Sequence, residues 1–145
     1  MLHKIYSLNQ SFNRYFCEYD FHNLYKELLS FCTVDLSAFY FDIRKDTLYC
    51  DPKNSEKRKS TLLVLNIILN SLLKWFAPIL SFTTEEIYQL VSKNNKSIHL
   101  EKFLNFPNNF ENEKLYQKWL ELIKIRNICN ISIEEQRANK EIGSS

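Results

Sequence analysis

Apolar residues recur every three or four positions through the first part of the chain, which is the period of a helix with one buried face. Residues 3–17 predict such a helix, whose apolar stripe consists of Ile5, Leu8, Phe12 and Phe16. Asp20 stands where the side chain of an N-cap residue would accept a hydrogen bond from a free amide. A second helix is predicted after it, with a stripe formed by Phe21, Leu24, Leu28 and Phe31.

The stretch TVDLSAFYFDIRKDTLYCD (33–51) loses this regular period. It holds four aromatic residues, and acids and bases stand between them in neither a strand nor a helix rhythm. Thr33 and Asp35 interrupt the preceding stripe, and Asp35 could cap a second short helix that carries Phe39 and Ile43. The pattern therefore predicts either one kinked helix or two consecutive helices.

The strongest helical pattern covers residues 56–80, after a turn predicted at CDPKNS (50–55), where Pro52 restricts its neighbour. Between residues 62 and 80 the polar side chains are Asn66, Asn70, Ser71 and Lys74. Three of these recur every fourth residue and form one narrow polar stripe, so neighbours should surround most of the helix. Pro78 should end or kink it near Phe76.

The same apolar stretch is long enough for a membrane span, which is the alternative to a buried helix. A lysine, two asparagines and a proline would then lie inside the bilayer, where such groups are costly. The pattern therefore favours a helix that is buried in protein.

The part of the chain after residue 80 predicts three further helices and one long connection. SFTTEEIYQLV (81–91) suggests a helix capped by Thr83 or Thr84, with Glu85 and Glu86 in its first turn. Residues 93–111 are polar and rich in Asn, which suggests a connection. Two helices are expected at 112–128 and 133–142, the first with Leu115, Trp119, Leu122 and Ile125 on one face. The sum is an all-α bundle of five to seven helices.

Composition supports a helical fold with one core. Apolar residues make up 45% of the chain, and one Gly and three Pro are too few for a domain built on many tight turns. The four cysteines form no C-x-x-C pair, so we expect reduced thiols that pack as small buried hydrophobes in a cytoplasmic protein. The N-terminus lacks the apolar core of a signal peptide.

The residues offer little catalytic chemistry. Three histidines lie far apart without a nucleophile beside them, and a single glycine cannot build a phosphate-binding loop. The formal net charge is only +2, but residues 53–60 hold four bases against one acid. A binding or structural module is therefore favoured over an enzyme.

Four motifs give the chain a family resemblance. YDFHNLYKELLSFCTVDLSAFYFDIRKDTLYCD (19–51) resembles the helical anticodon-binding domain of isoleucyl-tRNA synthetases, which are class Ia enzymes. SEKRKS resembles the Ser-x-x-Arg-Arg helix start of that family, with Arg58 and Lys59 at the paired basic positions. LLKWFAPILSFTTEEIYQLV and IKIRNICNISIEEQRANKEIG resemble two later blocks in the family's order.

The resemblance implies a domain that binds the anticodon stem-loop of an isoleucine-specific tRNA. Residues 1–92 would be the core of the anticodon-binding bundle, and residues 93–145 the connection and following C-terminal helices of the same domain. The chain would be a fragment of a larger ligase that joins isoleucine to its tRNA with ATP and Mg. The fragment itself would be inactive and would need no cofactor, because the catalytic domain and a zinc module lie elsewhere in such enzymes. Expected partners are tRNA and the catalytic domain of the parent chain, without membrane or DNA.

Basic residues are the first candidates for tRNA contacts, because Lys and Arg hold the phosphates of a stem. Lys57, Arg58 and Lys59 cluster at one helix start, where bases oppose the helix dipole, although a merely solvated helix start is the alternative. Arg44 and Lys45 come next, with local ion pairing to Asp42 and Asp46 as the alternative. The further candidates are Arg126 and Arg137, of which Arg126 could instead clamp other domains of the parent.

Aromatic residues are the second group, because unpaired bases of an RNA loop stack on aromatic rings. Tyr40 and Tyr49 are the preferred stacking candidates, since each ring carries a polar tip, whereas Trp75 and Phe76 are assigned to the core or to a docking face. The alternative for the whole chain is a helical protein-interaction or structural module that binds no RNA of its own.

Overall fold

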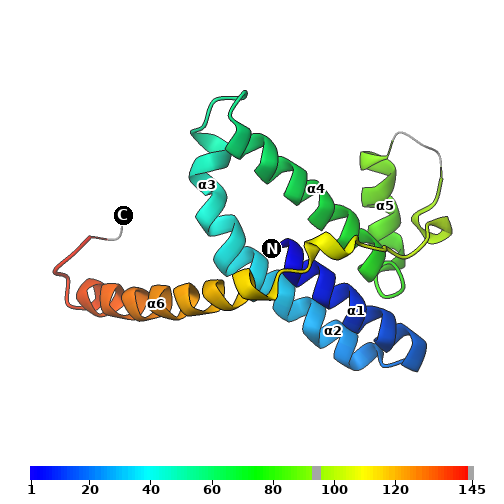
Figure 1. Cartoon of the computed structure of the whole chain (residues 1–145), viewed down its shortest axis with the longest axis horizontal. Coiled ribbons are helices and arrows are strands. Elements are labelled where there is room, and N and C mark those ends of the chain that lie inside the picture. The colour runs from blue at the N-terminus through cyan, green and yellow to red at the C-terminus, as the bar shows by residue number, and fades with distance from the viewer. Residues whose placement is uncertain (93–95, 144–145) are drawn as a thin grey trace. The chain divides into compact units, whose positions relative to one another are not determined.

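Helices make up all the regular structure of the computed structural model, which describes residues 1–92 and 96–143 (Figure 1). Their order is α1 (Leu2–Glu18), α2 (Phe21–Ser30), η1 (Phe31–Phe41), α3 (Asp42–Tyr49), α4 (Glu56–Phe76), α5 (Ser81–Val91), η2 (Ile98–Leu100), η3 (Asn108–Phe110) and α6 (Glu113–Ala138). The all-α prediction is confirmed. The chain forms two compact units, Met1–Phe110 and Glu111–Ser145. The predicted functional division at residue 92 stays a prediction.

The first two helices form as the apolar pattern predicts. α1 ends at Tyr19, whose backbone adopts the left-handed conformation with φ 56°, and its amide donates to the carbonyls of the preceding turn. Asp20 then caps α2, because its carboxylate accepts from the Asn23 amide at 3.1 Å. Both the helix end and the cap therefore lie where the sequence indicated.

The irregular stretch after residue 30 is helical without a break, and η1 is a π-helix, in which hydrogen bonds span five residues. Its buried residues are Phe31, Leu36 and Tyr40, spaced by five and four positions. This wider spacing explains why the sequence shows no 3.6-residue period there. The suggested cap at Asp35 is wrong, because Asp35 lies inside η1 and pairs with Lys4 at 3.4 Å.

α4 begins and ends as predicted but is only partly surrounded. Ser55 is its N-cap after the predicted turn, and the helix ends at Phe76, two residues before Pro78. Its second half is buried in the core, whereas Leu62 and Leu63 in its first half are 49% and 61% exposed. The expectation that neighbours surround most of α4 therefore holds for one half only. Within the described ranges, no helix is long and apolar enough to cross a bilayer.

α5 starts earlier than predicted. It begins at Ser81, and Thr84 lies inside the helix, where its hydroxyl donates to the Leu80 carbonyl at 2.9 Å. The predicted cap at Thr83 or Thr84 is therefore wrong, and Glu85 lies beyond the first turn. Glu85 instead accepts from Ser97 at 2.8 Å and from the Ile98 amide at 2.9 Å, which holds the following segment against α5.

Residues 96–110 form a connection, as predicted, and this connection packs on the bundle. Lys74, from the polar stripe of α4, donates to the Lys102 carbonyl at 3.0 Å and pairs with Glu101 at 3.2 Å. Tyr88 on α5 also donates to Glu101, at 3.3 Å. The polar stripe of α4 therefore anchors the connection and is not only solvated.

The core of the first unit is centred on Trp75 of α4, which is 1% exposed. Phe12 meets its ring edge-to-face at a centroid distance of 4.9 Å, and Phe31 does so at 6.2 Å. Its indole N–H donates to the side-chain oxygen of Asn9 at 3.1 Å, and Asn9 donates to the Leu104 carbonyl at 2.9 Å. One buried amide therefore joins α1, α4 and the connection.

The second unit contains one long helix where the sequence suggested two. α6 runs from Glu113 to Ala138, capped by the Asn112 side chain, which accepts from the Leu115 amide at 2.9 Å. The cysteines also differ from expectation. All four are free thiols, but three of them are exposed, namely Cys17, Cys50 and Cys129. The prediction that they pack as buried hydrophobes is therefore wrong for these three.

Candidate nucleic-acid interface

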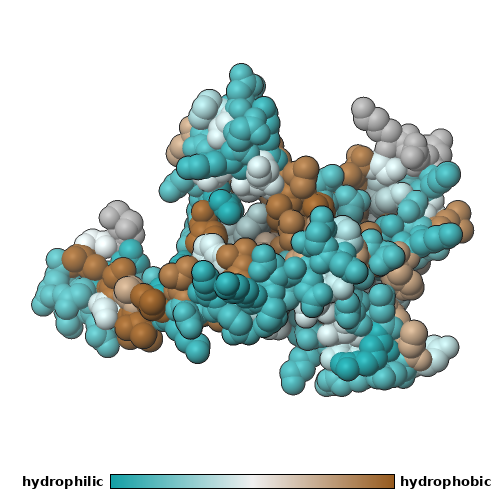
Figure 2. All heavy atoms as spheres, in the orientation of Figure 1, coloured by the Kyte–Doolittle hydropathy of each residue, from teal (hydrophilic) through white to brown (hydrophobic). Residues whose placement is uncertain are grey.

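The candidate interface is the end of the first unit where α3 and α4 meet, which we call the α3–α4 end and define as residues 44–60. The turn at 50–55 joins the two helices, which pack against each other (Figure 1). The atoms around this turn are mostly hydrophilic (Figure 2). Seven of the nine residues proposed from sequence lie at this end or just before it.

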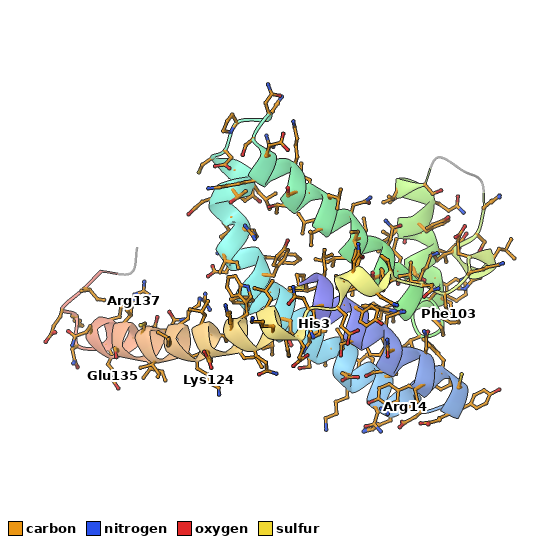
Figure 3. The ribbon with its side chains drawn as sticks, viewed as in Figure 1. His3, Arg14, Phe103, Lys124, Glu135 and Arg137 are labelled. Atoms are coloured by element: carbon orange, nitrogen blue, oxygen red, sulfur yellow. The ribbon has the colours of Figure 1, made fainter. Side chains whose placement is uncertain are left out.

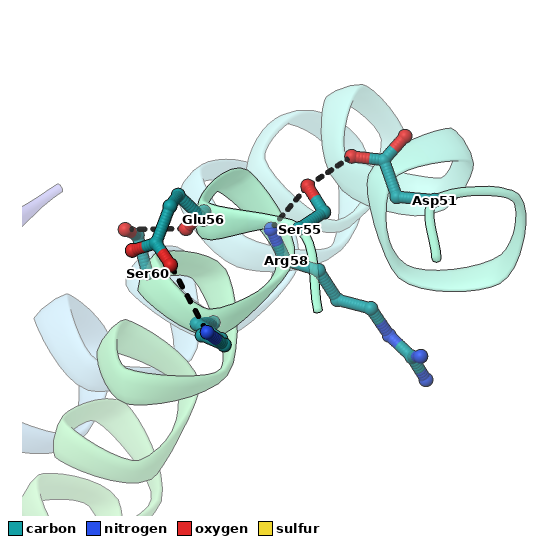
Figure 4. A network of polar contacts seen from close by, with 6 residues as sticks. Asp51, Ser55, Glu56, Arg58 and Ser60 are labelled. Carbon is teal, nitrogen blue, oxygen red and sulfur yellow. Dashed lines mark hydrogen bonds and ion pairs between the residues drawn. The ribbon is translucent and has the colours of Figure 1, made fainter. Parts of the chain in front are cut away.

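The first turn of α4 is held by a small polar network (Figure 4). The Ser55 hydroxyl donates to Asp51 at 3.0 Å and accepts from the Arg58 amide at 3.5 Å. Lys59 pairs with Glu56 at 3.0 Å, so that its charge is partly compensated. This network fixes the backbone from which the neighbouring bases project.

Lys57 and Arg58 are the uncompensated bases of this turn. The Arg58 side chain points away from the Ser55–Asp51 network in Figure 4, and its Nε is shielded from solvent without an acceptor. Within residues 1–92 and 96–143, no recorded ion pair involves either side chain. Two positive charges at a helix start gain nothing from the helix dipole, so an external anion is the partner that would stabilise them.

On α3, the two candidate bases lie in different surroundings. The Arg44 guanidinium stands 5.8 Å from the centre of the Tyr40 ring, within the range of a cation–π contact. Lys45 pairs with Asp42 at 2.8 Å, and the hydrogen bond and charge of Asp42 raise the pKa of the Lys45 ammonium. Both side chains add positive charge to this end.

The two tyrosines proposed for stacking are in opposite environments. Tyr40 is 5% exposed and belongs to the core, and burial raises the pKa of its hydroxyl. Its ring therefore offers no free face on which a base could stack. Tyr49 is 86% exposed in the last turn of α3, next to the turn that leads to α4.

Arg126 and Arg137 belong to the second unit. They are eleven residues apart on α6, which is close to three helical turns, so they share a face. Arg137 pairs with Glu134 at 2.7 Å. Figure 3 shows Arg137 and Lys124 projecting from opposite sides of this helix. That Arg126 and Arg137 contact tRNA stays a prediction.

Sequence reasoning passed over one base of this end. Lys53 is exposed in the 50–55 turn, between Tyr49 and the bases of α4. Lys53 is one of the four bases at 53–60, so the excess of basic residues in that stretch could have identified it. The described residues contain no group of three or more His, Cys, Asp or Glu side chains that could hold a metal ion. The arrangement is thus suited to binding an anion through its basic side chains, with one exposed ring on which a flat group could stack.

A helical domain with a basic, hydrophilic end is typical of a module that binds nucleic acid. The chain matches the family described as anticodon-binding domain of tRNA ligase over residues 1–145, and it belongs to that family. The resemblance found in the sequence is confirmed.

Three relatives place the chain more closely. It is 70% identical to the isoleucine–tRNA ligase of Pelagibacter ubique, over the whole chain and 16% of that protein. Identity is 42% with the isoleucine–tRNA ligase of Bartonella henselae and 39% with that of Agrobacterium fabrum, each over the whole chain and 15% of the relative. The chain thus spans less than a fifth of the length of these relatives.

Proposed function

We propose that this domain binds the anticodon stem-loop of an isoleucine-specific tRNA and that the α3–α4 end makes the main contacts. The observation that carries this proposal is the pair of uncompensated bases, Lys57 and Arg58, at the start of α4 in a member of the anticodon-binding family. Stem phosphates would be held by these two side chains and by Lys53, Arg44 and Lys45. Tyr49 would stack on an unpaired base of the loop.

The parent protein, on this proposal, ligates isoleucine to its tRNA with ATP and Mg. This domain would contribute binding and none of the chemistry, since the chain matches an anticodon-binding family over its whole length and spans only 16% of the first relative. The catalytic domain of the parent chain is a proposed partner. Support comes from exposed apolar side chains that a covering domain would bury, among them Phe82 at 93%, Leu90 at 82% and Leu100 at 80%. The zinc module and the cytoplasmic location stay predictions.

The proposal is tested by the salt dependence of tRNA binding. The variant Lys57→Gln/Arg58→Gln removes two phosphate contacts, so the slope of log K against log salt should become shallower by roughly 1.5. Affinity at low salt should fall by at least about tenfold. Filter binding with isoleucine tRNA, and with the same tRNA carrying a changed anticodon, measures both quantities.

A matched control is available on the α1–α2 hairpin. Lys26→Gln/Arg14→Gln changes the net charge equally at two exposed positions outside the α3–α4 end and should leave the slope unchanged. Equal losses in the two double variants would mean that only overall charge matters. Failure of the wild-type chain to distinguish the two tRNAs would contradict anticodon binding.

A further inference from the structure

A polar pocket lies in the first unit between α1 and the connection that follows α5, away from the residues of the α3–α4 end. Its volume is 380 Å³, within the range of small-molecule sites in proteins. In Figure 1 the connection runs across α1 at this place, and the hydrogen bond from Asn9 to Leu104 joins the two. No part of the candidate interface described above contributes to its lining.

The lining of this pocket is unusual because its polar groups are uncharged. Five amide side chains contribute, and they are Asn9, Gln10, Asn13, Asn105 and Asn108. Each amide carries two N–H donors and an oxygen acceptor, so together they can match a ligand that presents donors and acceptors side by side. Without a lining cation or carboxylate, the pocket has no charge with which to select a phosphate or a metal ion.

The buried end of the pocket is rigidly built. Asn9 is 5% exposed, and its amide already uses one N–H on the Leu104 carbonyl and one lone pair on the Trp75 indole. One N–H and one lone pair remain on this side chain. Its orientation is fixed by Trp75 in the core and by the Leu104 carbonyl in the connection, so these groups are held ready for a ligand.

Aromatic rings complete the lining. The lining rings are Tyr6 and Phe106. Tyr6 donates to Asn108 at 3.4 Å, and Phe106 is supported from outside the lining by Phe110, with ring centres 5.6 Å apart and 24° between their planes. A planar heterocycle with donors and acceptors on its edge is the ligand that both features suit, since bases are recognised by stacking and by edge hydrogen bonds. We propose that this pocket holds a single nucleobase.

The source of that base is an unpaired nucleotide of the bound RNA, and this part of the inference rests on the function proposed above. Base recognition and phosphate binding would then use different elements, with the base held between α1 and residues 105–108 and the phosphates at α3 and α4. Substitutions in the pocket should therefore weaken base recognition without changing phosphate binding, and substitutions at the α3–α4 end should do the reverse. An extended peptide could also use neutral amides, but the two rings in the lining, Tyr6 and Phe106, favour a flat heterocycle.

The experiment uses anticodon stem-loop RNA in which 2-aminopurine replaces each unpaired base in turn. Binding to the whole chain should change the fluorescence strongly at one loop position. Asn13→Ala and Asn105→Ala, at exposed positions of the rim, should weaken binding by about tenfold, since an edge contact to a base is of that size. The salt slope should stay unchanged. Asn109→Ala is the matched control, an exposed neighbour outside the lining, and should behave as wild type.

A second arm needs no variant and separates the two possible sources of the base. Free adenosine, guanosine, cytidine and uridine are titrated into the wild-type chain, and the side-chain amide resonances of Asn13 and Asn105 are followed by NMR. Shifts with a nucleoside but no RNA binding would assign the pocket to a free nucleoside and would contradict the function proposed above. If both rim variants bind RNA as tightly as wild type, and no nucleoside shifts the amide resonances, the pocket does not bind a nucleobase. The function proposed above would be unaffected by that result. Shifts with an extended peptide alone would also overturn the assignment of the pocket to a nucleobase.

Discussion

At the residue scale, local chemistry in the sequence does not decide exposure. Tyr40 and Tyr49 have the same side chain and the same polar tip, yet one is 5% and the other 86% exposed. The difference arises because Tyr40 follows Leu36 on the inner side of η1, whereas Tyr49 is in the last turn of α3. To predict that Tyr40 is buried, one must know that residues 31–41 form a π-helix, because its wider turn brings different residues to the inner side than a 3.6-residue period does.

Some caps follow from the local sequence, as Asp20 does, and Ser55 gives a test at this scale. Ser55→Ala removes the acceptor for the Arg58 amide and the donor to Asp51, so the free energy of unfolding should fall by about 1 kcal/mol. Urea denaturation followed by circular dichroism measures this change. Ser60→Ala, one turn further along α4, is the control and should change it by less than about 0.5 kcal/mol. Equal effects of the two substitutions would show that Ser55 is not the cap.

At the element scale, the sequence predicts where α1 and α4 lie, whereas it misplaces the start of α5 and divides α6. The stripes over 3–17 and 56–80 predicted α1 and α4 because long amphipathic periods have few alternatives. The sequence pattern suggests two helices within residues 112–142, whereas α6 is one helix that continues to Ala138. This stretch contains no strong helix breaker before Gly143. At α5, Thr84 lies inside the helix and its hydroxyl donates to a backbone carbonyl of the preceding turn. The general preference of Thr for N-cap positions does not predict this interior position.

Glu85 gives a pH-dependent test at this scale. Hydrogen bonds from Gln89 and Ser97, and then from the Ile98 amide, hold the pKa of the Glu85 carboxyl below its usual value. Because the folded pKa is lowered, its contribution to stability is present above the ordinary glutamate pKa of about 4.3 and is lost as the pH falls through the folded value. The Ile98 amide resonance should therefore shift with a midpoint below about pH 4.3.

The controls for this titration are two neighbouring substitutions. Glu85→Gln cannot titrate and should abolish the shift of the Ile98 resonance, whereas Glu86→Gln, at an exposed position, should leave it unchanged. A wild-type midpoint above the ordinary glutamate value, or an equal effect of both substitutions, would contradict the role assigned to Glu85.

At the scale of the whole molecule, polar groups distant in sequence fix how the segments of the first unit pack. Asn9 and Trp75 are 66 positions apart, and Asn9 and Leu104 are 95 apart, yet one amide serves both. An asparagine on a helix is expected to face solvent, so nothing local predicts that this one is buried. Core formation around Trp75 decides it, because the indole N–H needs an acceptor once it is removed from water.

Asn9→Ala should be among the more destabilising substitutions of a polar residue in the first unit. It leaves the Trp75 N–H and the Leu104 carbonyl without partners, at a cost of about 2–3 kcal/mol in the free energy of unfolding. Asn13→Ala, one turn further on the same helix and exposed, is the control and should cost less than about 0.5 kcal/mol. Equal midpoints in urea denaturation would mean that water replaces the lost amide.

Sequence alone determined that the chain is all-α, where its first helices begin, and which family it resembles, because helical period, caps and motifs are local properties of neighbouring residues. It also indicated Lys57 and Arg58 as candidates for contacts with tRNA. Only tertiary structure decided that Tyr40 is buried and Tyr49 exposed, that Asn9 links three segments, and that five neutral amides enclose one pocket. These depend on contacts between residues far apart in the chain, which form only when the core excludes water and each buried polar group must find a partner.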